Sequence, residues 1–383
     1  MDNFFPIELI SDEATEIQAI RDNMVAEYLS EAQSYPWIIT FSGGKDSTLV
    51  AHLVFEMLLD LPPNLRKRPV YFVSNDTLVE SPLVVKHMRD TLHAILHAAK
   101  LYKLPVTGEI TQPKLQETFW TLLIGKGYPS PNKSMRWCTD RLKIQPTSQY
   151  ILNKVAENGA AIIVLGVRKD ESSTRKASIE SHQNIGTSNL TPHSDLSNAL
   201  VYRPIVDLTT DDVWLFLSEH QPPWGGTHDG LIKLYREAAG GECPIVLSQD
   251  DAPGCGTNSS RFGCWTCTVV NKDRSLQGFV DVGKSEYEPL LKFRDWLLEI
   301  RNKPEYRQLE RRNGTVTIKN GKHIPGPFTL EARQMILDHL LMIQQDYLNE
   351  DATRPPLISQ AEIDLIKHIW SEDAMAFHSR RHL

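Results

Sequence analysis

The sequence has few cysteines and no long apolar run, and both absences narrow the kind of protein it encodes. Five cysteines in 383 residues, an odd number and mostly clustered, fit a reducing cytosol in which thiols serve as ligands or reagents rather than as crosslinks. The longest apolar run, 160–167, has only the length of a buried strand, so we expect no signal peptide and no membrane span. These features predict a cytoplasmic protein.

Basic charge is also scarce, because 41 Lys and Arg stand against 48 Asp and Glu for a formal net charge of −7. A stand-alone nucleic-acid binder needs a concentrated basic surface to release counterions, so we expect any contact with DNA or RNA to be local or assisted by a partner. With 41% hydrophobic and 23% charged residues, the composition is that of an ordinary globular protein, which argues against disordered, collagenous and coiled-coil classes.

What the sequence does contain is an alternation of short β-branched runs and helical patterns. This alternation predicts an α/β fold with a doubly wound, mostly parallel sheet covered by helices on both faces. The predicted strands cover 37–41, 69–75, 106–110 and 160–166, and the predicted helices cover 14–33, 47–61, 82–104 and 139–157. Residues 171–200, rich in Ser, Thr, Asn and His, are expected to form a mobile loop over a site.

The chain is expected to divide near residue 220. Residues 1–220 are predicted to form the α/β domain with its N-terminal helix, and residues 221–383 a Cys-rich segment followed by helices. The predicted helices of this second part cover 284–302, 329–349 and 360–371.

A glycine turn between the first predicted strand and its helix has the chemistry of a phosphate-binding loop. Free backbone N–H groups and the positive end of the helix dipole attract phosphate there, and glycines let the main chain approach it. The loop is not a Walker A motif, since Ile39 stands where that motif needs its first glycine. The alternative is an ordinary turn and helix cap. The loop residues are Ser42, Gly43, Gly44, Lys45, Asp46 and Ser47.

An acidic residue in such a loop makes sense if Asp46 holds a Mg²⁺ that bridges phosphate oxygens while Lys45 neutralises charge on the leaving group. Asp76, just beyond a predicted strand, is expected at the carboxyl edge of the sheet, with a ribose or Mg²⁺ role. In the segment 166–175, Arg168 and Arg175 carry guanidinium groups that stay charged and can donate two hydrogen bonds to one phosphate. Glu171 is expected to orient one of them or to hold the metal; the alternative for the run is a solvated loop.

These segments resemble the N-type ATP pyrophosphatases, a family that includes PAPS reductases, tRNA thiolases and the DNA phosphorothioation proteins DndC and SspD. The loop SGGKDS resembles their pyrophosphatase loop, 136–144 their R-x-C-x-x-x-x-K segment with Cys138 and Lys143, and 166–175 their G-x-R-x-x-E-S-x-x-R segment. The segment 204–214 resembles the strand and helix that close their fold, and 261–267 is similar to a stretch of DndC and SspD in particular. The resemblance implies ATP binding across the sheet, release of pyrophosphate and usually an adenylylated intermediate.

Four of the five cysteines lie in a Gly-rich segment and form only one C-x-x-C pair. A zinc ribbon normally supplies two close pairs, so the irregular spacing favours a [4Fe-4S] cluster held by four thiolates, with zinc or unliganded buried thiols as alternatives. The resemblance to DndC, which looks like an iron–sulfur protein, also favours the cluster. The predicted metal ligands are Cys243, Cys255, Cys264 and Cys267.

The fifth cysteine, Cys138, has Arg136, Arg141 and Lys143 as close neighbours in the sequence, and nearby cations are expected to lower a thiol pKa. Three roles stay open for it. It is a nucleophile or persulfide carrier beside the nucleotide, a cluster ligand that replaces one of the four, as in the related APS reductases, or a structural buried residue.

The resemblance implies an ATP-dependent sulfurtransferase step in DNA backbone phosphorothioation, with Cys138, Lys45, Asp46 and Arg168 as the catalytic residues. Its partners are then a cysteine desulfurase as sulfur donor, other phosphorothioation proteins, and DNA as substrate. Three alternatives remain: a PAPS-type reductase, which needs a redox-active cysteine near the C terminus whereas 268–383 contain none; a tRNA thiolase; and a metal-stabilised DNA-binding subunit with a vestigial ATP site. The DNA-binding alternative is suggested by residues 292–323, which contain nine Lys or Arg and only four Asp or Glu. The same residues are equally typical of a solvated helix surface.

Overall fold

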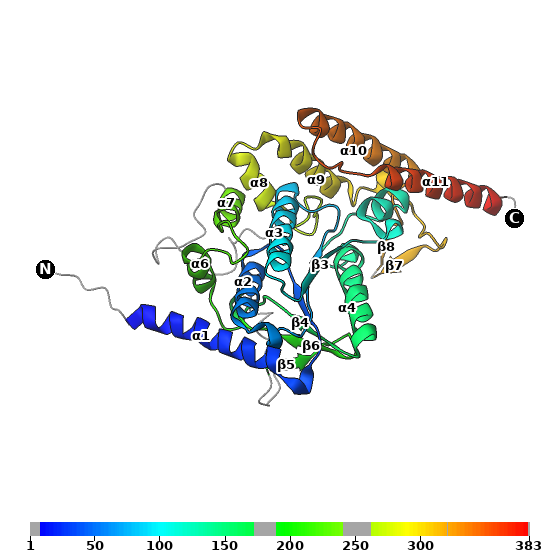
Figure 1. The fold of residues 1–383 in the computed structure, drawn as a ribbon. Helices are drawn as coiled ribbons and strands as arrows, with labels where there is room; N and C mark the ends of the chain where they lie inside the picture. Colours follow the sequence, from blue (N-terminus) through cyan, green and yellow to red (C-terminus); the bar gives the residue numbers. More distant parts are fainter. Residues whose placement is uncertain (1–7, 172–188, 240–261, 320, 382–383) are drawn as a thin grey trace.

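The protein is an α/β fold built on a six-stranded sheet, as Figure 1 shows in a computed structural model that describes residues 8–171, 189–239, 262–319 and 321–381. The strand order is β3-β2-β1-β4-β6-β5, and every neighbouring pair is parallel except β5 and β6. The predicted fold class is therefore confirmed. The strands are β1 (Trp37–Thr40), β2 (Val70–Asn75), β3 (Val106–Thr111), β4 (Ala161–Val164), β5 (Leu190–Pro192) and β6 (Ala199–Tyr202).

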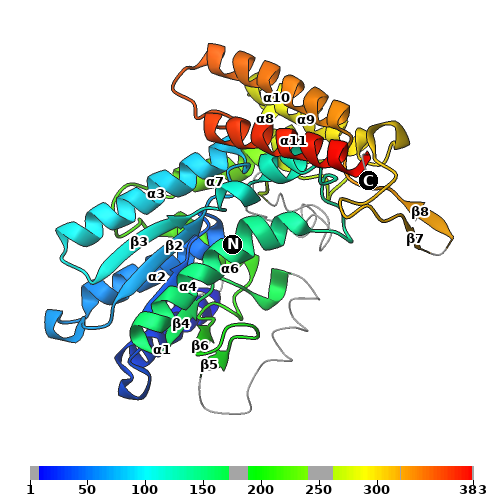
Figure 2. The same cartoon turned by 90° about the vertical axis from the view of Figure 1, so that its right-hand side faces the viewer.

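Helices cover both faces of this sheet, and a second group of helices forms a layer at one end of it (Figure 2). Around the sheet lie α1 (Glu8–Leu29), α2 (Lys45–Asp60), α3 (Pro82–Leu101), α4 (Gln145–Asn158), α6 (Thr210–Glu219) and α7 (Asp229–Ala238). The end layer contains α8 (Arg274–Asp281), α9 (Glu288–Ile300), α10 (Leu330–Glu350) and α11 (Gln360–Arg381), with the small hairpin β7 (Thr317–Lys319) and β8 (Lys322–Ile324) projecting beside it. None of the helices within the described ranges is both long and apolar enough to cross a membrane.

The order of the strands places the start of α2 at the centre of the molecule. β1 pairs with β2 on one side and with β4 on the other. The chain therefore adds β2 and β3 on one side of β1 and the later strands on the opposite side, so the strand order reverses beside β1. Trp37 and Ile39 of β1 are fully buried because helices cover both faces of the strand. In open α/β sheets, ligands bind at the carboxyl ends of the strands next to such a reversal, which is where the turn after β1 lies.

A second hydrophobic core joins the end layer to the middle of the chain. Phe119 and Trp120 pack there together with Trp265 and Phe293, and the indole N–H of Trp120 donates to the carbonyl of Leu357 at 2.7 Å. This core takes residues from both sides of residue 220. The division into two domains at that position remains a prediction.

The structure corrects several expected boundaries. The helix expected over 139–157 begins as a π-helix, Thr139–Ile144, and becomes α-helical at Gln145, where Pro146 follows. Residues 189–200 of the expected loop over 171–200 instead contribute to the antiparallel pair β5 and β6, while 172–188 lie outside the described residues. The helices α7 and α8 have no counterpart among the predicted elements.

We predict that stability falls with acidity because of a buried histidine pair. His52 and His228 face each other with 3.2 Å between Nδ1 and Nε2, and His228 is 6% exposed. Burial, helped by His52 and His87, lowers the pKa of His228 to about 4, whereas the unfolded chain keeps about 6.5. Since only the unfolded chain gains this proton between those values, the free energy of unfolding should fall by about 3 kcal/mol as pH drops from 6.5 to 4.

Urea unfolding of the wild type and of His228→Gln at several pH values between 7 and 4.5 measures this contribution. We expect the variant to lose less stability than the wild type over that interval. Equal losses in both proteins would show that His228 does not carry the effect.

Candidate nucleotide and cysteine site

The turn after β1 is shaped in advance as an anion-binding loop. Gly43 has a φ of +73°, and a Cβ there would lie 2.9 Å from the Cβ of Met88, so only glycine fits. Ser47 Oγ donates to the carbonyl of Gly44 at 3.0 Å and accepts the N–H of Ser42 at 3.2 Å, which fixes the turn. Gly44 caps α2 without any side-chain hydrogen bond, so no cap side chain occupies the N–H groups at the start of the helix.

The charged residues of the loop are held by a buried arginine from another strand end. Asp46 accepts from Arg168 Nε at 2.6 Å and from Lys45 Nζ at 2.7 Å. Arg168 is 1% exposed, and its remaining nitrogens donate to Asp170, the carbonyl of Leu208 and the hydroxyl of Thr210. The sequence assigned this guanidinium to direct phosphate contact, whereas the structure uses it to position Asp46. Its phosphate role and the Mg²⁺ role of Asp46 stay predictions.

A close approach of two backbone segments brings these residues together. A Cβ at Gly166, which follows β4, would lie 2.8 Å from the carbonyl oxygen of Asp46, so glycine is needed for the two loops to approach. Burial lowers the pKa of Lys45 although the adjacent Asp46 carboxylate favours its charged form. The loop therefore combines a partly neutralised cluster of charges with the N–H groups at the start of a helix, which suits an incoming phosphate anion.

Asp76 lies directly after β2 at the carboxyl edge of the sheet, where the sequence placed it. It is 3% exposed and accepts the N–H of Leu78 at 2.8 Å and a guanidinium hydrogen of Arg89 at 2.6 Å, with Gln112 at 3.5 Å. Arg89, on α3, was not anticipated, because nothing in a helical pattern marks which exposed arginine turns back toward a strand end. The ribose or Mg²⁺ role of Asp76 stays a prediction.

The C-x-x-C turn docks on the loop that follows Asp76. The N–H of Trp265 donates to the carbonyl of Val79 at 3.0 Å, and the N–H of Ser81 donates to the carbonyl of Gly263 at 3.3 Å. Within the turn, the N–H of Cys267 donates to the carbonyl of Cys264 at 3.0 Å. These bonds place the two thiols beside the same sheet edge that carries the phosphate loop.

Cys138 joins this pair, at the start of the π-helix, close enough for its thiol and that of Cys267 to influence each other electrostatically. Burial, and then the neighbouring Cys267, raise the pKa of Cys138; burial raises the pKa of Cys264 to about 12. The expectation that adjacent cations lower the Cys138 pKa is therefore wrong. Two of those cations have carboxylate partners of their own, Arg141 with Glu117 at 2.6 Å and Lys143 with Glu80 at 2.9 Å.

The remaining predicted site residues are not all placed. Cys243, Cys255 and Arg175 lie outside the described residues, and the side chain of Glu171 is likewise not described. Cys138, Cys264 and Cys267 are free thiols. Within the ranges that the structure describes, no three His, Cys, Asp or Glu side chains are already arranged as a metal site.

Tyr235 on α7 is the residue that the sequence did not reveal. Its hydroxyl accepts the backbone N–H of Lys45 at 3.3 Å, and its ring packs edge-on against Phe262 with 4.5 Å between centroids. Phe262 lies two residues before Cys264. Tyr235 thus connects the phosphate loop to the cysteine turn, which no spacing or motif in the sequence predicts.

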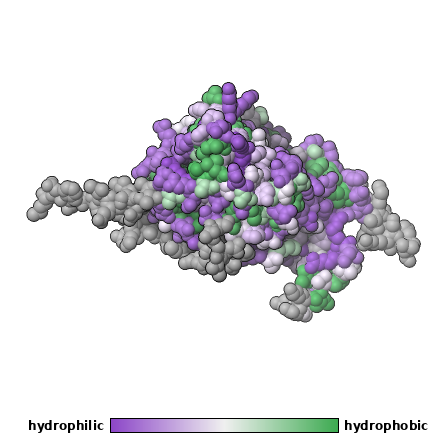
Figure 3. Space-filling model, turned by 60° about the horizontal axis from the view of Figure 1, so that its bottom comes forward, coloured by the Kyte–Doolittle hydropathy of each residue, from purple (hydrophilic) through white to green (hydrophobic). Residues whose placement is uncertain are grey.

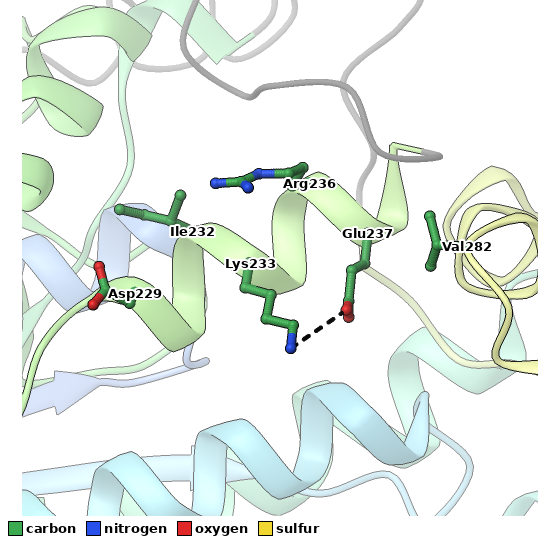
Figure 4. Close-up of a pocket in the computed structure, with 6 residues that line it drawn as sticks. All are labelled: Asp229, Ile232, Lys233, Arg236, Glu237 and Val282. Atoms are coloured by element: carbon green, nitrogen blue, oxygen red, sulfur yellow. Dashed lines mark ion pairs between the residues drawn. The ribbon is translucent and has the colours of Figure 1, made fainter.

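A cavity of about 420 Å³ on α7 is lined by none of the predicted site residues. Figure 4 shows its lining along α7, including the pair Lys233 and Glu237 at 3.9 Å, with Val282 from beyond α8. The candidate site is therefore the loop and the thiols at the sheet edge rather than this cavity. The lining residues are Asp229, Ile232, Lys233, Arg236, Glu237 and Val282.

Comparison with known proteins agrees with this arrangement at the level of the family. The model of the phosphoadenosine phosphosulfate reductase domain family matches residues 36–270, which contain the loop, Cys138 and the C-x-x-C turn. An uncharacterized protein of Methanocaldococcus jannaschii is 25% identical over 194 residues, which is 51% of this chain and 34% of that protein. The chain thus spans about a third of the length of this relative.

Solved structures resemble the chain only weakly. An FMN adenylyltransferase of Candida glabrata has a TM-score of 0.36 at 12% identity, covering 86% of this chain and 81% of its own. A U34-tRNA thiolase of Methanococcus maripaludis, solved with its [4Fe-4S] cluster, has a TM-score of 0.33 at 13% identity, covering 75% and 80%. A phosphoadenylyl-sulfate reductase of Candida auris has 0.32 at 12%, covering 57% and 89%. These scores are too low to transfer any residue's role.

We predict that the ion pair between Arg168 and Asp46 contributes strongly to stability. Arg168→Gln should lower the free energy of unfolding by about 3 kcal/mol, because it leaves a partly buried carboxylate with one cation fewer. Combining it with Asp46→Asn should cost less than the sum of the two single variants, with a coupling of about 1–3 kcal/mol in urea unfolding. Lys169→Gln is the control. Lys169 follows Arg168 in the sequence and forms an exposed ion pair with Asp207, so its replacement should lower the free energy of unfolding by about 1 kcal/mol or less. Additive single effects would contradict the prediction.

Proposed function

Since the chain belongs to the phosphoadenosine phosphosulfate reductase domain family, we propose that it catalyses the ATP-dependent sulfurtransferase step of DNA backbone phosphorothioation. Family membership makes it an ATP-using enzyme of the PAPS reductase and ATP pyrophosphatase superfamily. The finer assignment, with DNA as substrate and a cysteine desulfurase and other phosphorothioation proteins as partners, is our proposal. It draws on the resemblance of 261–267 to DndC and SspD.

The observation that carries the proposal is that thiols and phosphate loop share one edge of the sheet. The C-x-x-C turn forms backbone hydrogen bonds with Val79 and Ser81 in the loop after β2. Tyr235 contacts both the phosphate loop and Phe262. An enzyme that activates a phosphate with ATP and then places sulfur on it needs this proximity, because correct positioning of two reactants supplies much of a rate enhancement.

The proposed reaction proceeds in two displacements. A nonbridging oxygen of a DNA phosphate attacks the α-phosphorus of ATP, and the bond between the α- and β-phosphates breaks, so that pyrophosphate leaves with the electron pair. The terminal sulfur of a persulfide then attacks the DNA phosphorus, and AMP leaves. A thiol reductant supplies two electrons to cleave the remaining sulfur–sulfur bond. Lys45 and the N–H groups of the loop stabilise the negative charge that develops on the departing pyrophosphate.

The described thiols fit an iron–sulfur site in their chemistry. Thiols are the ligands that such clusters take, although the three described cysteines are not already arranged as a metal site. Burial raises the pKa of Cys138 and of Cys264, so a bound metal would be needed to make these two thiolates at neutral pH. We therefore assign Cys138, Cys264 and Cys267 as ligands, with Cys243 and Cys255 as candidates for the remaining position. When bound, such a cluster supplies iron that holds or passes sulfur.

The alternative of a DNA-binding scaffold loses support from the placement of its basic residues. Arg294, Arg301 and Arg307 donate to main-chain carbonyls inside the end layer, and Arg312 pairs with Asp373 at 2.9 Å. These four cations already have partners, so they add little to a free basic face among the described side chains of 292–323. Figure 3 shows small hydrophobic groups mixed among hydrophilic side chains on the face it presents.

The first test is the product formed from ATP. The wild type should release AMP and pyrophosphate, or exchange labelled pyrophosphate into ATP, and Asp46→Ala should lower that rate by about 100-fold or more, because the loop loses the carboxylate assigned to Mg²⁺. Asp90→Ala, which removes an exposed carboxylate on α3, is the control and should leave the rate unchanged. Release of ADP instead of AMP would contradict the proposal.

The second test concerns the thiols and the substrate. Anaerobically purified wild type should absorb near roughly 400 nm and contain iron, and Cys138→Ser should lose most of both. With a cysteine desulfurase, a thiol reductant and ATP, the wild type should produce phosphorothioate linkages in DNA, detected by mass spectrometry of nuclease digests. Thiolation of tRNA instead of DNA would favour the thiolase alternative. Full iron in Cys138→Ser with lost sulfur transfer would assign Cys138 to the nucleophile role.

A further inference from the structure

Tyr235 reaches the phosphate loop from α7, 190 positions further along the chain than Lys45, which makes it the most distant contributor to the loop among the described residues. Its hydroxyl lies 3.3 Å from the backbone nitrogen of Lys45 and 3.3 Å from the place where a Cβ on Gly44 would stand. The phenol oxygen is therefore at the first turn of α2, where the loop offers its N–H groups. A polar atom at this point contacts whatever anion the loop binds.

The proton of this hydroxyl has no acceptor in the described part of the chain. The N–H of Lys45 donates to the phenol oxygen, and no described group accepts in return. Burial raises the pKa of Tyr235, so the phenol keeps its proton at neutral pH. The side chain is partly buried, and a phosphate oxygen in the loop would supply the acceptor that the described protein groups do not.

The ring is held so that the hydroxyl keeps its position. Trp214 packs edge-on against it from α6 with 4.8 Å between centroids, and Phe262 packs edge-on at 4.5 Å. A donor fixed before the ligand arrives loses little entropy on binding, which is how preorganised groups stabilise developing charge.

We propose that the Tyr235 hydroxyl is a phosphate contact of the loop and donates a hydrogen bond to the pyrophosphate portion of the nucleotide. We choose the pyrophosphate portion because Tyr235 accepts the backbone N–H of Lys45, and Lys45 is the residue assigned to the pyrophosphate leaving group. This inference rests on the proposed function in one respect only, namely that the loop binds a nucleotide. It does not depend on the substrate that receives the sulfur.

The test uses the full chain with Tyr235→Phe, which removes the hydroxyl and keeps the ring contacts with Trp214 and Phe262. The matched control is Tyr28→Phe, because this tyrosine also packs in the core and its hydroxyl donates to a backbone carbonyl, that of Arg68 at 2.8 Å, outside the loop. Calorimetry with Mg²⁺ and three probes measures binding: α,β-methylene-ATP, inorganic pyrophosphate and AMP.

We expect Tyr235→Phe to weaken binding of the ATP analogue and of pyrophosphate by about tenfold or more, the value for a hydrogen bond to a charged acceptor, with AMP changed by less than about threefold. Tyr28→Phe should bind all three probes as the wild type does. Unchanged pyrophosphate binding in Tyr235→Phe would overturn the inference, and so would an equal loss for pyrophosphate and AMP, which indicates a distorted fold.

The outcomes separate this inference from the proposed function. A wild type that binds the ATP analogue and pyrophosphate but transfers no sulfur to DNA overturns the proposed function alone, and the Tyr235→Phe comparison still decides the inference. A wild type that binds neither probe overturns both.

Discussion

The buried ion pair between Arg168 and Asp46 determines the arrangement of the candidate site. It joins the turn after β1 to the turn after β4, the two strand ends between which the sheet reverses its winding. Burying a guanidinium is unfavourable unless its hydrogens find acceptors, and Asp46, Asp170, Leu208 and Thr210 supply them. The same requirement explains Gly166, since a side chain there would keep the two turns apart.

Burial acts on both halves of the site in the direction of lower charge. It lowers the pKa of Lys45 in the loop and raises the pKa of the thiols Cys138 and Cys264 at the neighbouring strand end. Burial therefore disfavours the charged forms of Lys45 and of the two thiols, and a bound phosphate or metal would favour them.

The sequence was sufficient for the features that depend on local patterns. The strand, glycine turn and helix at 37–61 and the position of Asp76 follow from hydrophobic periodicity and from the rule that parallel strands end at one edge. It was insufficient where a long-range contact decides. Tyr235 and Arg89 act through surfaces that meet only after folding, and the pKa of Cys138 is set mainly by its burial and then by Cys267, which is distant in the sequence. The pair β5 and β6 was missed because each strand is only three or four residues long, too short for a clear periodic pattern.

The second hydrophobic core also constrains how the chain can be divided. Trp120 and Phe119 come from the first half of the sequence, yet Trp265, Phe293 and the carbonyl of Leu357 surround them. A fragment that ended at residue 220 would expose two aromatic rings and an indole N–H to water, and it would be prone to aggregate. The shared core therefore couples the stability of the phosphate loop to that of the thiol-bearing turn and the end layer.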